Sequence, residues 1–381
     1  MDLRLTDQQT ASRARARRFA TEHIAPLAQQ IDREEVLPEA LLHALACDGW
    51  LGAALPKQWG GGGMDPVAYG LATEEIGKVC SSVRSLLTSH NMAAQAILRH
   101  GNAEQKQLFL PDLCSGRRII SFALTEENAG SAGKAIVADA AEYDGKYRVN
   151  GTKLWITCGQ IAHLYLVFGR SADQHIALLI ERDAEGVVVE PMPKVLGTRG
   201  SMLARLRLTN VEVPVAQRIG AVGAGIAFVA NTALDHGRFS VAWGAAGIIQ
   251  ACLDATHAYL TKRGQDGHPL VEHQLVKRQL TDMLLAYTSV RALCLRSACL
   301  RKTGDQRAAM ETMLAKYHGA GAAVECATNA LRMHGANGYS LDFPVERYLR
   351  DAMALEIIEG TKEMNQVGLA SYALQWPHIN E

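Results

Sequence analysis

The chain has 381 residues, of which 48% are hydrophobic, and its 39 lysines and arginines balance its 39 aspartates and glutamates. Neither sign of charge forms a long block, which argues against a nucleic-acid groove or a membrane-surface patch. The length favours two or three packed units over a single small core.

Residues 6–116 carry apolar side chains at helical spacing, as in Leu41, Leu42 and Leu45. This third of the chain is predicted to be mostly helix. The stretch from Pro56 to Pro66 contains four consecutive glycines, 60–63, which cannot sustain a helix and predict a loop.

From Arg118 onward the apolar residues fall in short runs separated by turn residues, as in Ile119–Leu124 and Ile176–Ile180. This pattern predicts the strands of a β domain that ends at Pro214. Long segments rich in alanine and leucine follow from Ile226 and predict a helical bundle. The predicted fold class is therefore α+β, in the order helical, β, helical.

The eight cysteines never stand at C-x-x-C spacing, and reduced, buried thiols in a cytoplasmic protein are expected. Residues 1–30 alternate charged and apolar side chains, unlike a signal peptide. We expect no apolar stretch long enough to span a bilayer, so no membrane partner is predicted.

Two patches in the predicted β domain carry candidate ligand-binding groups. In the first, a strand-like run passes into a loop that holds Thr125 and Ser131, whose hydroxyls and neighbouring N–H groups suit an anionic or heteroaromatic ligand; an ordinary turn is the alternative. In the second, Trp155 and Thr157 stand two apart on a predicted strand and so face the same side. An aromatic plane beside a hydroxyl suits a flat ring system, although a tryptophan in a sandwich core remains open.

The third patch surrounds Glu359, which follows two aliphatic residues and precedes a glycine. Its carboxylate is expected at a loop facing a partly apolar pocket, where desolvation raises the pKa and strengthens the base. The alternative is a helix start with Thr361 as N-cap and Glu363 in the first turn, and both can hold together. No spacing typical of metal ligands is present, and none of a P-loop or a nucleophile elbow.

Together and in this order, the three patches resemble the acyl-CoA dehydrogenase family over essentially the whole chain. The resemblance implies an N-terminal helical domain (1–118), a middle β domain (119–222) and a C-terminal four-helix bundle domain (223–381). It also implies FAD as cofactor. In the family pattern Thr125, Ser131, Trp155 and Thr157 contact the flavin, Ser131 also meets the substrate, and Arg238 lies near the substrate.

Further residues match positions that serve the FAD of a neighbouring subunit, which predicts a homodimer or a homotetramer. Arg263 matches the arginine at the FAD pyrophosphate, a role that suits a guanidinium fork. Gln274, Gly335 and Ala336 match further cofactor contacts. Three positions depart from the family pattern: Asp266 and His273 each stand where an aromatic is usual, and Arg332 stands where a glutamine is usual.

The resemblance makes Glu359 the catalytic base, with Gly360 at the substrate and with Thr361 and Glu363 contacting FAD. Glu359 would remove a substrate α-proton while a hydride passes to flavin N5, and an electron acceptor flavoprotein or oxygen would reoxidise the cofactor. The predicted function is the oxidation of a short acyl thioester.

Three segments, 80–90, 237–244 and 356–359, look most like the branch that oxidises acyl groups on an acyl carrier protein for polyketide extender units in secondary metabolism. His90 is a candidate contact to a short polar acyl group there, with a helix-packing histidine as the alternative. A flavin oxidase or monooxygenase on the same fold, and a flavin-binding protein without turnover, are the other functions considered.

Overall fold

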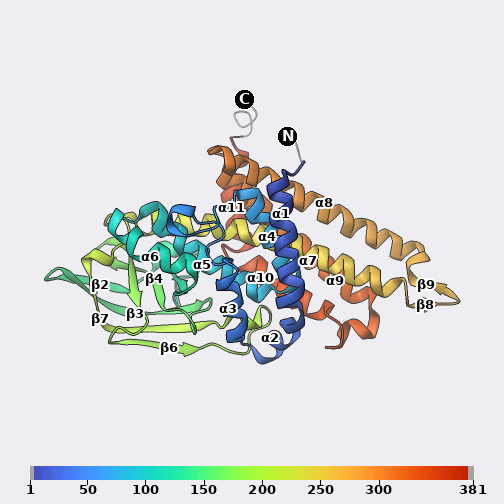
Figure 1. The fold of residues 1–381 in the computed structure, drawn as a ribbon, viewed down its shortest axis with the longest axis horizontal. Helices are drawn as coiled ribbons and strands as arrows, with labels where there is room; N and C mark the ends of the chain where they lie inside the picture. Colours follow the sequence, from blue (N-terminus) through green and yellow to red (C-terminus); the bar gives the residue numbers. More distant parts are fainter. Residues whose placement is uncertain (1–3, 376–381) are drawn as a thin grey trace.

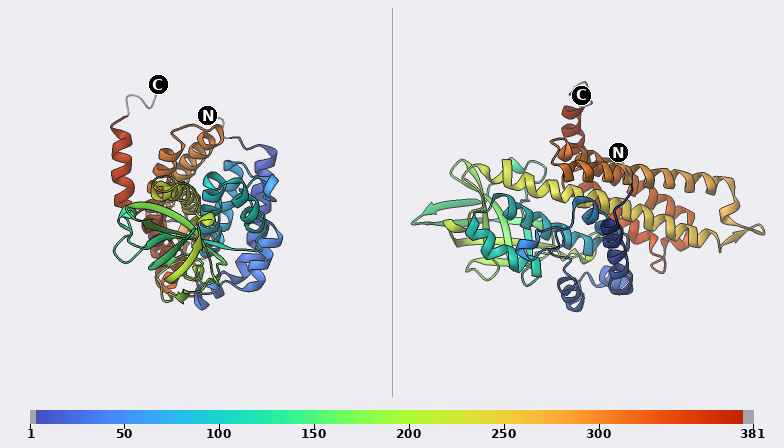
Figure 2. Two further views of the ribbon diagram at one scale, coloured as in Figure 1. Left: turned by 90° about the vertical axis from the view of Figure 1, so that its left-hand side faces the viewer. Right: turned by 45° about the horizontal axis from the view of Figure 1, so that its top comes forward.

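The structure is a computed structural model that describes residues 4–375 (Figure 1). The first helices, coloured blue, lie along one side of the molecule in the left view of Figure 2. Capping residues set several helix starts: Thr6 and Asn102 each begin a capping box, and Asp65 caps a helix whose first residue is proline. The helices are α1 (Asp7–Phe19), α2 (Ala28–Glu34), α3 (Glu39–Cys47), α4 (Pro66–Val79), α5 (Ser81–His100) and α6 (Ala103–Ser115).

The predicted glycine loop is confirmed, since no helix forms between Trp59 and Pro66. Gly60 and Gly63 have φ angles of +86° and +61°, which favour glycine. A Cβ at Gly61 would lie 2.2 Å from the Leu55 carbonyl oxygen, so the loop also needs glycine for close backbone packing.

The predicted β domain is confirmed as a seven-stranded sheet in the order β1-β4-β2-β3-β7-β6, with β5 paired to β4. Strands β1 and β4 run parallel, whereas the β2–β3, β3–β7, β4–β5 and β6–β7 pairs are antiparallel. The strands are β1 (Ile120–Ala123), β2 (Asp139–Tyr143), β3 (Lys146–Ile156), β4 (Leu164–Ser171), β5 (Gln174–Glu181), β6 (Val187–Pro191) and β7 (Ala204–Pro214).

The C-terminal part is again helical, and its long helices extend away from the sheet to a small hairpin (Figure 1). Helix α7 packs against α4 and α5 and so joins the two helical parts into one continuous core. Helix α11 projects from the body of the molecule (Figure 2). The elements are α7 (Asn231–Leu260), β8 (Gly264–Gln265), β9 (His268–Pro269), α8 (Gln274–Thr303), α9 (Ala308–Met333), α10 (Val345–Ile357) and α11 (Lys362–Ala373).

Helix α8 corrects one expectation from the sequence, because within residues 4–375 it is long and apolar enough to cross a membrane by length and composition. A core helix of a bundle passes the same test, and α8 packs on α9, α7 and α4. It also carries Arg291, Arg296 and Arg301, each paired with a carboxylate of a neighbouring element. These contacts indicate that α8 is a helix of the C-terminal bundle.

All eight cysteines are free, as the sequence predicted. Six of them are buried, whereas Cys47 is exposed and Cys299 lies at the margin of the core. Burial raises the pKa of Cys114 to about 11, so this thiol stays protonated.

Candidate active site

Glu359 lies in the turn that joins α10 to α11, where its side chain meets α7. A Cβ built on Gly237 of α7 would stand 2.4 Å from Glu359 Oε2 and 2.7 Å from the sulfur of Met92 on α5. The absence of a side chain at Gly237 therefore makes the space that the carboxylate occupies. Three helices, α5, α7 and α10, bring these residues together.

The carboxylate of Glu359 has an unusual environment, because its Oε2 atom is buried and accepts no hydrogen bond within the described part of the chain. Burial raises the pKa of Glu359 to about 7, although the positive charges of Arg238, Lys316 and Arg84 act in the opposite direction. The direction of this shift is the one that the sequence predicted. A carboxylate with such a pKa is poised to accept a proton near neutral pH.

The backbone of this turn is held from three sides. Arg238 of α7 donates through Nε to the Glu359 carbonyl at 3.1 Å, and Lys316 of α9 donates to the Gly360 carbonyl at 2.6 Å. Asn365 of α11 donates to the carbonyls of Gly360 and Thr361. Arg238 is thus placed beside Glu359, and its predicted position near the substrate stays a prediction.

The N–H groups of Glu359, Gly360 and Thr361 donate no hydrogen bond to any described residue. Thr361 caps α11 by accepting from the Met364 N–H at 3.4 Å, and Glu363 lies exposed in the first turn of that helix. The helix-start alternative is therefore also correct. Consecutive free N–H groups at a helix start can bind the oxygen atoms of a ligand.

A buried arginine without a carboxylate partner lies further along the same helices. Arg84 of α5 is 1% exposed, and its guanidinium donates to the hydroxyls of Ser85 at 3.0 Å and Thr88 at 3.1 Å. Thr88 in turn lies 2.6 Å from the Ser240 hydroxyl of α7. Burial lowers the pKa of Arg84 to about 10, so the side chain remains a cation at neutral pH, and its Nε is unpaired.

Glycines make room for this cation as well. A Cβ at Gly244 would stand 2.5 Å from Arg84 Cδ, and Gly244 lies seven residues after Gly237 on α7. Seven residues correspond to about two helical turns, or roughly 10 Å. Ser240 stands between the two glycines, so one face of α7 leads from Glu359 past hydroxyl groups to the buried guanidinium.

In the β domain, the loop that follows β1 is fixed by a buried ion pair. Lys153 and Glu126 are 0% and 7% exposed and lie 2.6 Å apart. Glu126 also accepts from the N–H groups of Val137 and Ala138, and so ties the two ends of the intervening loop together. Thr125 lies at one foot of this loop and Ser131 lies exposed near its tip.

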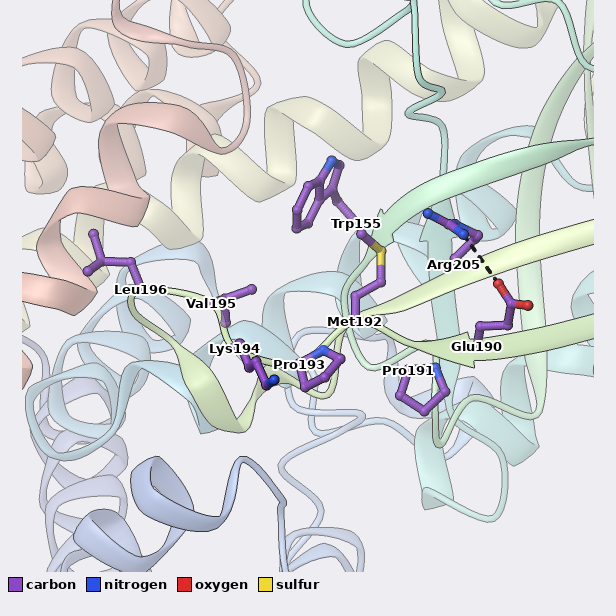
Figure 3. A pocket seen from close by; sticks show the side chains of 9 residues that line it. All are labelled: Trp155, Glu190, Pro191, Met192, Pro193, Lys194, Val195, Leu196 and Arg205. Atoms are coloured by element: carbon purple, nitrogen blue, oxygen red, sulfur yellow. Dashed lines mark ion pairs between the residues drawn. The ribbon is translucent and has the colours of Figure 1, made fainter.

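Trp155 and Thr157 require a correction, because they do not share a regular strand. Strand β3 ends at Ile156, and its register against β7 shifts between Lys153 and Ile156. Trp155 has a φ of +60° and is 54% exposed, so it is not a sandwich-core tryptophan. This bulge turns the indole outward, where it borders an open pocket of about 530 Å³ with Met192, Leu196 and Arg205 (Figure 3).

A second group of predicted cofactor residues lies at the far end of the C-terminal helices. Arg263 directly precedes the β8–β9 hairpin, Gln274 begins α8, and Gly335 and Ala336 follow α9. Tyr259, at the end of α7, stacks on His334 at 4.3 Å and accepts from the Asn337 side chain, which joins the hairpin end to the turn after α9. Of the other predicted cofactor residues, Thr361 and Glu363 follow Glu359 directly, whereas Thr125, Ser131, Trp155 and Thr157 belong to the β domain. The group near the hairpin is therefore separate in the chain from the group around Glu359.

His90 is fully buried, and both of its ring nitrogens bond to the backbone. Nε2 lies 3.0 Å from the Leu113 carbonyl, and Nδ1 accepts from the Ile120 N–H at 3.3 Å. Burial lowers its pKa to about 4, so the ring is neutral. This arrangement fits the packing alternative and leaves no polar atom of His90 for a substrate.

The site contains three buried cations that sequence reasoning missed, namely Arg84, Lys153 and Lys316. Each stands among apolar or small residues at core positions, and this placement is the signal that could have identified them. No cluster of side chains suited to a metal ion occurs among the described residues.

The helical, β, helical order of this chain is the domain order of a known class of dehydrogenases. The chain belongs to the acyl-CoA dehydrogenase family. Family models match the N-terminal domain over residues 6–117, the middle domain over 121–211 and the C-terminal domain over 223–372. The chain is accordingly an oxidoreductase of the class that acts on CH–CH groups, and the cofactor of this family is FAD.

Several relatives match nearly the whole chain. A short-chain-specific acyl-CoA dehydrogenase of Clostridium acetobutylicum is 34% identical over 96% of this chain and 98% of its own. The structure of butyryl-CoA dehydrogenase from Megasphaera elsdenii is 31% identical, with a TM-score of 0.95 over 98% and 100% of the two chains. FkbI, for biosynthesis of a methoxymalonyl extender unit, is 33% identical, with a TM-score of 0.87 over 95% and 99%.

The residues present fit FAD. Trp155 offers an exposed aromatic plane, and the N–H groups of residues 359–361 are free donors at a helix start. A Cβ at Gly335 would meet no atom within 4 Å, which leaves the backbone of that turn open to a ligand. Arg263 is exposed, and its guanidinium suits a phosphate group.

Proposed function

We propose that this protein is an FAD-dependent dehydrogenase of short acyl thioesters, with Glu359 as the base that removes the α-proton. The observation that carries the proposal is the Glu359 Oε2 atom, which is buried beside Gly237 and has no hydrogen-bond partner among residues 4–375. The pKa of this carboxyl, about 7, suits proton abstraction. FAD supplies the hydride acceptor when it is bound.

A thioester α-proton is only weakly acidic, so its removal also needs hydrogen bonds to the thioester carbonyl, which residues of this turn can donate. Hydrogen bonds to the thioester carbonyl lower the barrier when they strengthen as negative charge develops on that oxygen. The free N–H groups of residues 359–361 supply suitable donors, and Gly360 leaves space beside them. The Glu359 Oε2 atom is buried beside Gly237 of α7, near Met92 of α5.

The proposal is tested by Glu359→Gln, which keeps the shape of the side chain and removes the base. Wild-type protein titrated anaerobically with butyryl-CoA is expected to lose its oxidised flavin absorbance. The variant is expected to bind FAD equally and to bleach at least a thousandfold more slowly. Bleaching of the variant at the wild-type rate would overturn the role of Glu359, and a wild-type flavin that no thioester bleaches would favour a binding protein without turnover.

Arg84 favours a polar acyl group as the substrate. A buried guanidinium that bonds only to hydroxyls and has an unpaired Nε is suited to an oxygen atom at the distal end of the acyl chain. The face of α7 that runs from Gly237 to Gly244 gives the direction from Glu359 to this group. The similarity to FkbI supports a second candidate function, the oxidation of a hydroxyacyl unit on an acyl carrier protein.

The two candidates are separated by presenting the same acyl groups on CoA and on an acyl carrier protein. Butyryl, 4-hydroxybutyryl and succinyl groups test the distal oxygen. Because Arg84 also lowers the pKa of Glu359, Arg84→Met is expected to slow every substrate to some extent. The loss of kcat/KM is expected to be roughly tenfold to a hundredfold larger for the oxygen-bearing groups than for butyryl. An equal loss for all three groups would show that Arg84 supports the fold rather than specificity.

We also propose that the active unit contains at least two copies of the chain. The second group of predicted cofactor residues lies at the hairpin end, whereas Glu359 lies in the turn between α10 and α11. Leu284 and Leu285 of α8 are adjacent and are 57% and 67% exposed, and a second copy would cover them. Reoxidation by an electron acceptor flavoprotein or by oxygen remains part of the same proposal.

A further inference from the structure

Lys316 is a buried cation beside the turn that carries Glu359. Its side chain on α9 is 1% exposed, and Nζ donates to the Gly360 carbonyl at 2.6 Å. Within residues 4–375 it forms no ion pair within 4 Å. Because a buried ammonium loses several kcal/mol of hydration, an apolar side chain would be the cheaper choice at this position.

The bond from Lys316 acts on an unusual backbone. Glu359 and Gly360 have φ angles of +55° and +91°, so a non-glycine residue and its neighbour both adopt the left-handed region. A non-glycine residue persists in this conformation only when the surrounding structure holds it there. Here the carbonyls of both residues are held, that of Glu359 by Arg238 and that of Gly360 by Lys316.

A peptide group is planar, and in its trans form the C=O and the following N–H point in opposite directions. The bond from Lys316 therefore sets the direction of the Thr361 N–H, and the bond from Arg238 sets that of the Gly360 N–H. These two N–H groups donate to no described residue. The left-handed backbone that these bonds hold also sets the direction of the Cα–Cβ bond of Glu359.

We propose that Lys316 is a positioning residue of the proton-transfer step, since its buried ammonium holds the Gly360 carbonyl and thereby aims both the Glu359 carboxylate and the free N–H groups. The inference rests on the proposed function of Glu359. Lys316 acts through the turn and is not assigned a contact with the substrate.

The charge of Lys316 gives this role a measurable signature. The charged groups around Glu359 are Arg238 on α7, Lys316 on α9 and Arg84 on α5, and each lowers its pKa. Lys316 in turn faces Glu359, Arg238, Glu356 and Glu363. Burial lowers the pKa of Lys316 to about 8, so it is mostly protonated at neutral pH. Loss of this charge leaves Glu359 harder to ionise.

Asn365 also donates to the Gly360 carbonyl, at 2.7 Å, so the position of this carbonyl does not depend on Lys316 alone. Substitutions of Lys316 can therefore separate the effect of its charge from the effect of its hydrogen bond. Lys316→Gln offers the carbonyl a neutral donor, Lys316→Met offers none, and Lys316→Arg keeps a cation with donors. Lys362→Met is the matched control, since Lys362 follows the same turn, is half exposed and makes only a loose contact with Glu356 at 3.5 Å.

The test is an infrared pH titration of the Glu359 carboxyl in each FAD-loaded variant, assigned by the band that Glu359→Gln removes. The titration midpoint is expected to move to higher pH in Lys316→Met and Lys316→Gln, and to stay near the wild-type value in Lys316→Arg and Lys362→Met. In parallel, kcat/KM at pH 7 is expected to fall roughly tenfold or more in Lys316→Met, and less in Lys316→Arg.

The outcomes separate this inference from the proposed function. An unchanged midpoint and unchanged kcat/KM in Lys316→Met would overturn it. A shifted midpoint in a protein that oxidises no thioester would leave the position of Lys316 correct and the proposed activity wrong. Loss of FAD from Lys316→Met and Lys316→Arg alike, with no shift of the midpoint in Lys316→Gln, would assign Lys316 to folding alone.

Discussion

At the scale of single residues, the site depends on charges that are buried beside few partners. Glu359 has no hydrogen-bond donor to Oε2 within the described chain, and Arg84 has no carboxylate partner. Both groups reduce stability relative to apolar side chains of similar size. Their presence is explained if a ligand completes their interactions, as is typical of active sites.

The burial of the Glu359 carboxyl predicts that the stability of the folded protein depends on pH. The pKa of Glu359 is raised from 4.5 to about 7 by burial. A carboxyl whose pKa is higher in the folded state favours folding most below pH 4.5, and this contribution is lost as the pH rises through 7. Glu359→Gln does not ionise, so the variant is expected to be more stable than wild type above pH 7, by at most about 3 kcal/mol, and to match it more closely at pH 5.

Thermal unfolding of the FAD-free protein at pH 5, 7 and 9 measures this effect. The difference in Tm between variant and wild type should grow with pH. A difference that is constant over this range would show that Glu359 ionises in the folded protein as readily as in water. Glu363→Gln is the control, because Glu363 is exposed on the same turn.

At the scale of elements, α7 organises the site through its small residues. Gly237 makes space for the Glu359 carboxylate and Gly244 makes space for Arg84. Both lie on the face of α7 that packs against α5, where Ser240 bonds to Thr88. At these two positions α7 has no side chain to pack, and two charged groups occupy the space in the interior.

Gly237→Ala tests this arrangement with one methyl group. Alanine favours a helix interior over glycine by about 1 kcal/mol, so the substitution does not weaken α7 itself. The added Cβ would overlap Glu359 Oε2 at 2.4 Å and force the carboxylate away. The turnover of butyryl-CoA is expected to fall by roughly a hundredfold, with the FAD content retained.

Gly321→Ala on α9 provides the comparison, because its Cβ would meet only the Glu356 carboxylate at an ordinary 3.6 Å. Wild-type activity is expected there. If Gly237→Ala is also fully active, the carboxylate has another position from which it can work, and the geometry described for Glu359 is not required.

The elements also show how far the sequence allowed prediction. Helical periodicity and short apolar runs placed the helices and strands correctly, because burial follows these two patterns. The alternation rule failed at Trp155, since a bulge inserts an extra residue that only pairing with β7 produces. Lys316 was missed for a similar reason, because the Gly360 carbonyl that it binds comes from a distant part of the chain. The hydroxyl partners of Arg84 are local, on Ser85 and Thr88, but its burial depends on Gly244 of the distant helix α7.

At the scale of the whole molecule, the two groups of predicted cofactor residues lie on different parts of one chain. Arg263 adjoins the β8–β9 hairpin, which Figure 1 shows at the end of the long helices opposite the sheet. We propose that the two groups bind one FAD and come from different copies. Each copy then supplies Glu359 to one site and Arg263 to another, and the smallest complete unit is a dimer.

Complementation between inactive variants tests this shared site. Arg263→Ala is expected to bind FAD weakly and Glu359→Gln to bind it without bleaching. In a mixed dimer of the two, one site combines Glu359 of the first chain with Arg263 of the second and is complete, while the other site lacks both. With two affinity tags and purification of mixed dimers, about half of the sites should therefore bleach with butyryl-CoA, although neither parent does. If Arg263 and Glu359 act within one chain, a mixed dimer contains no intact site, so the absence of bleaching would show that the dimer is not needed to complete the site.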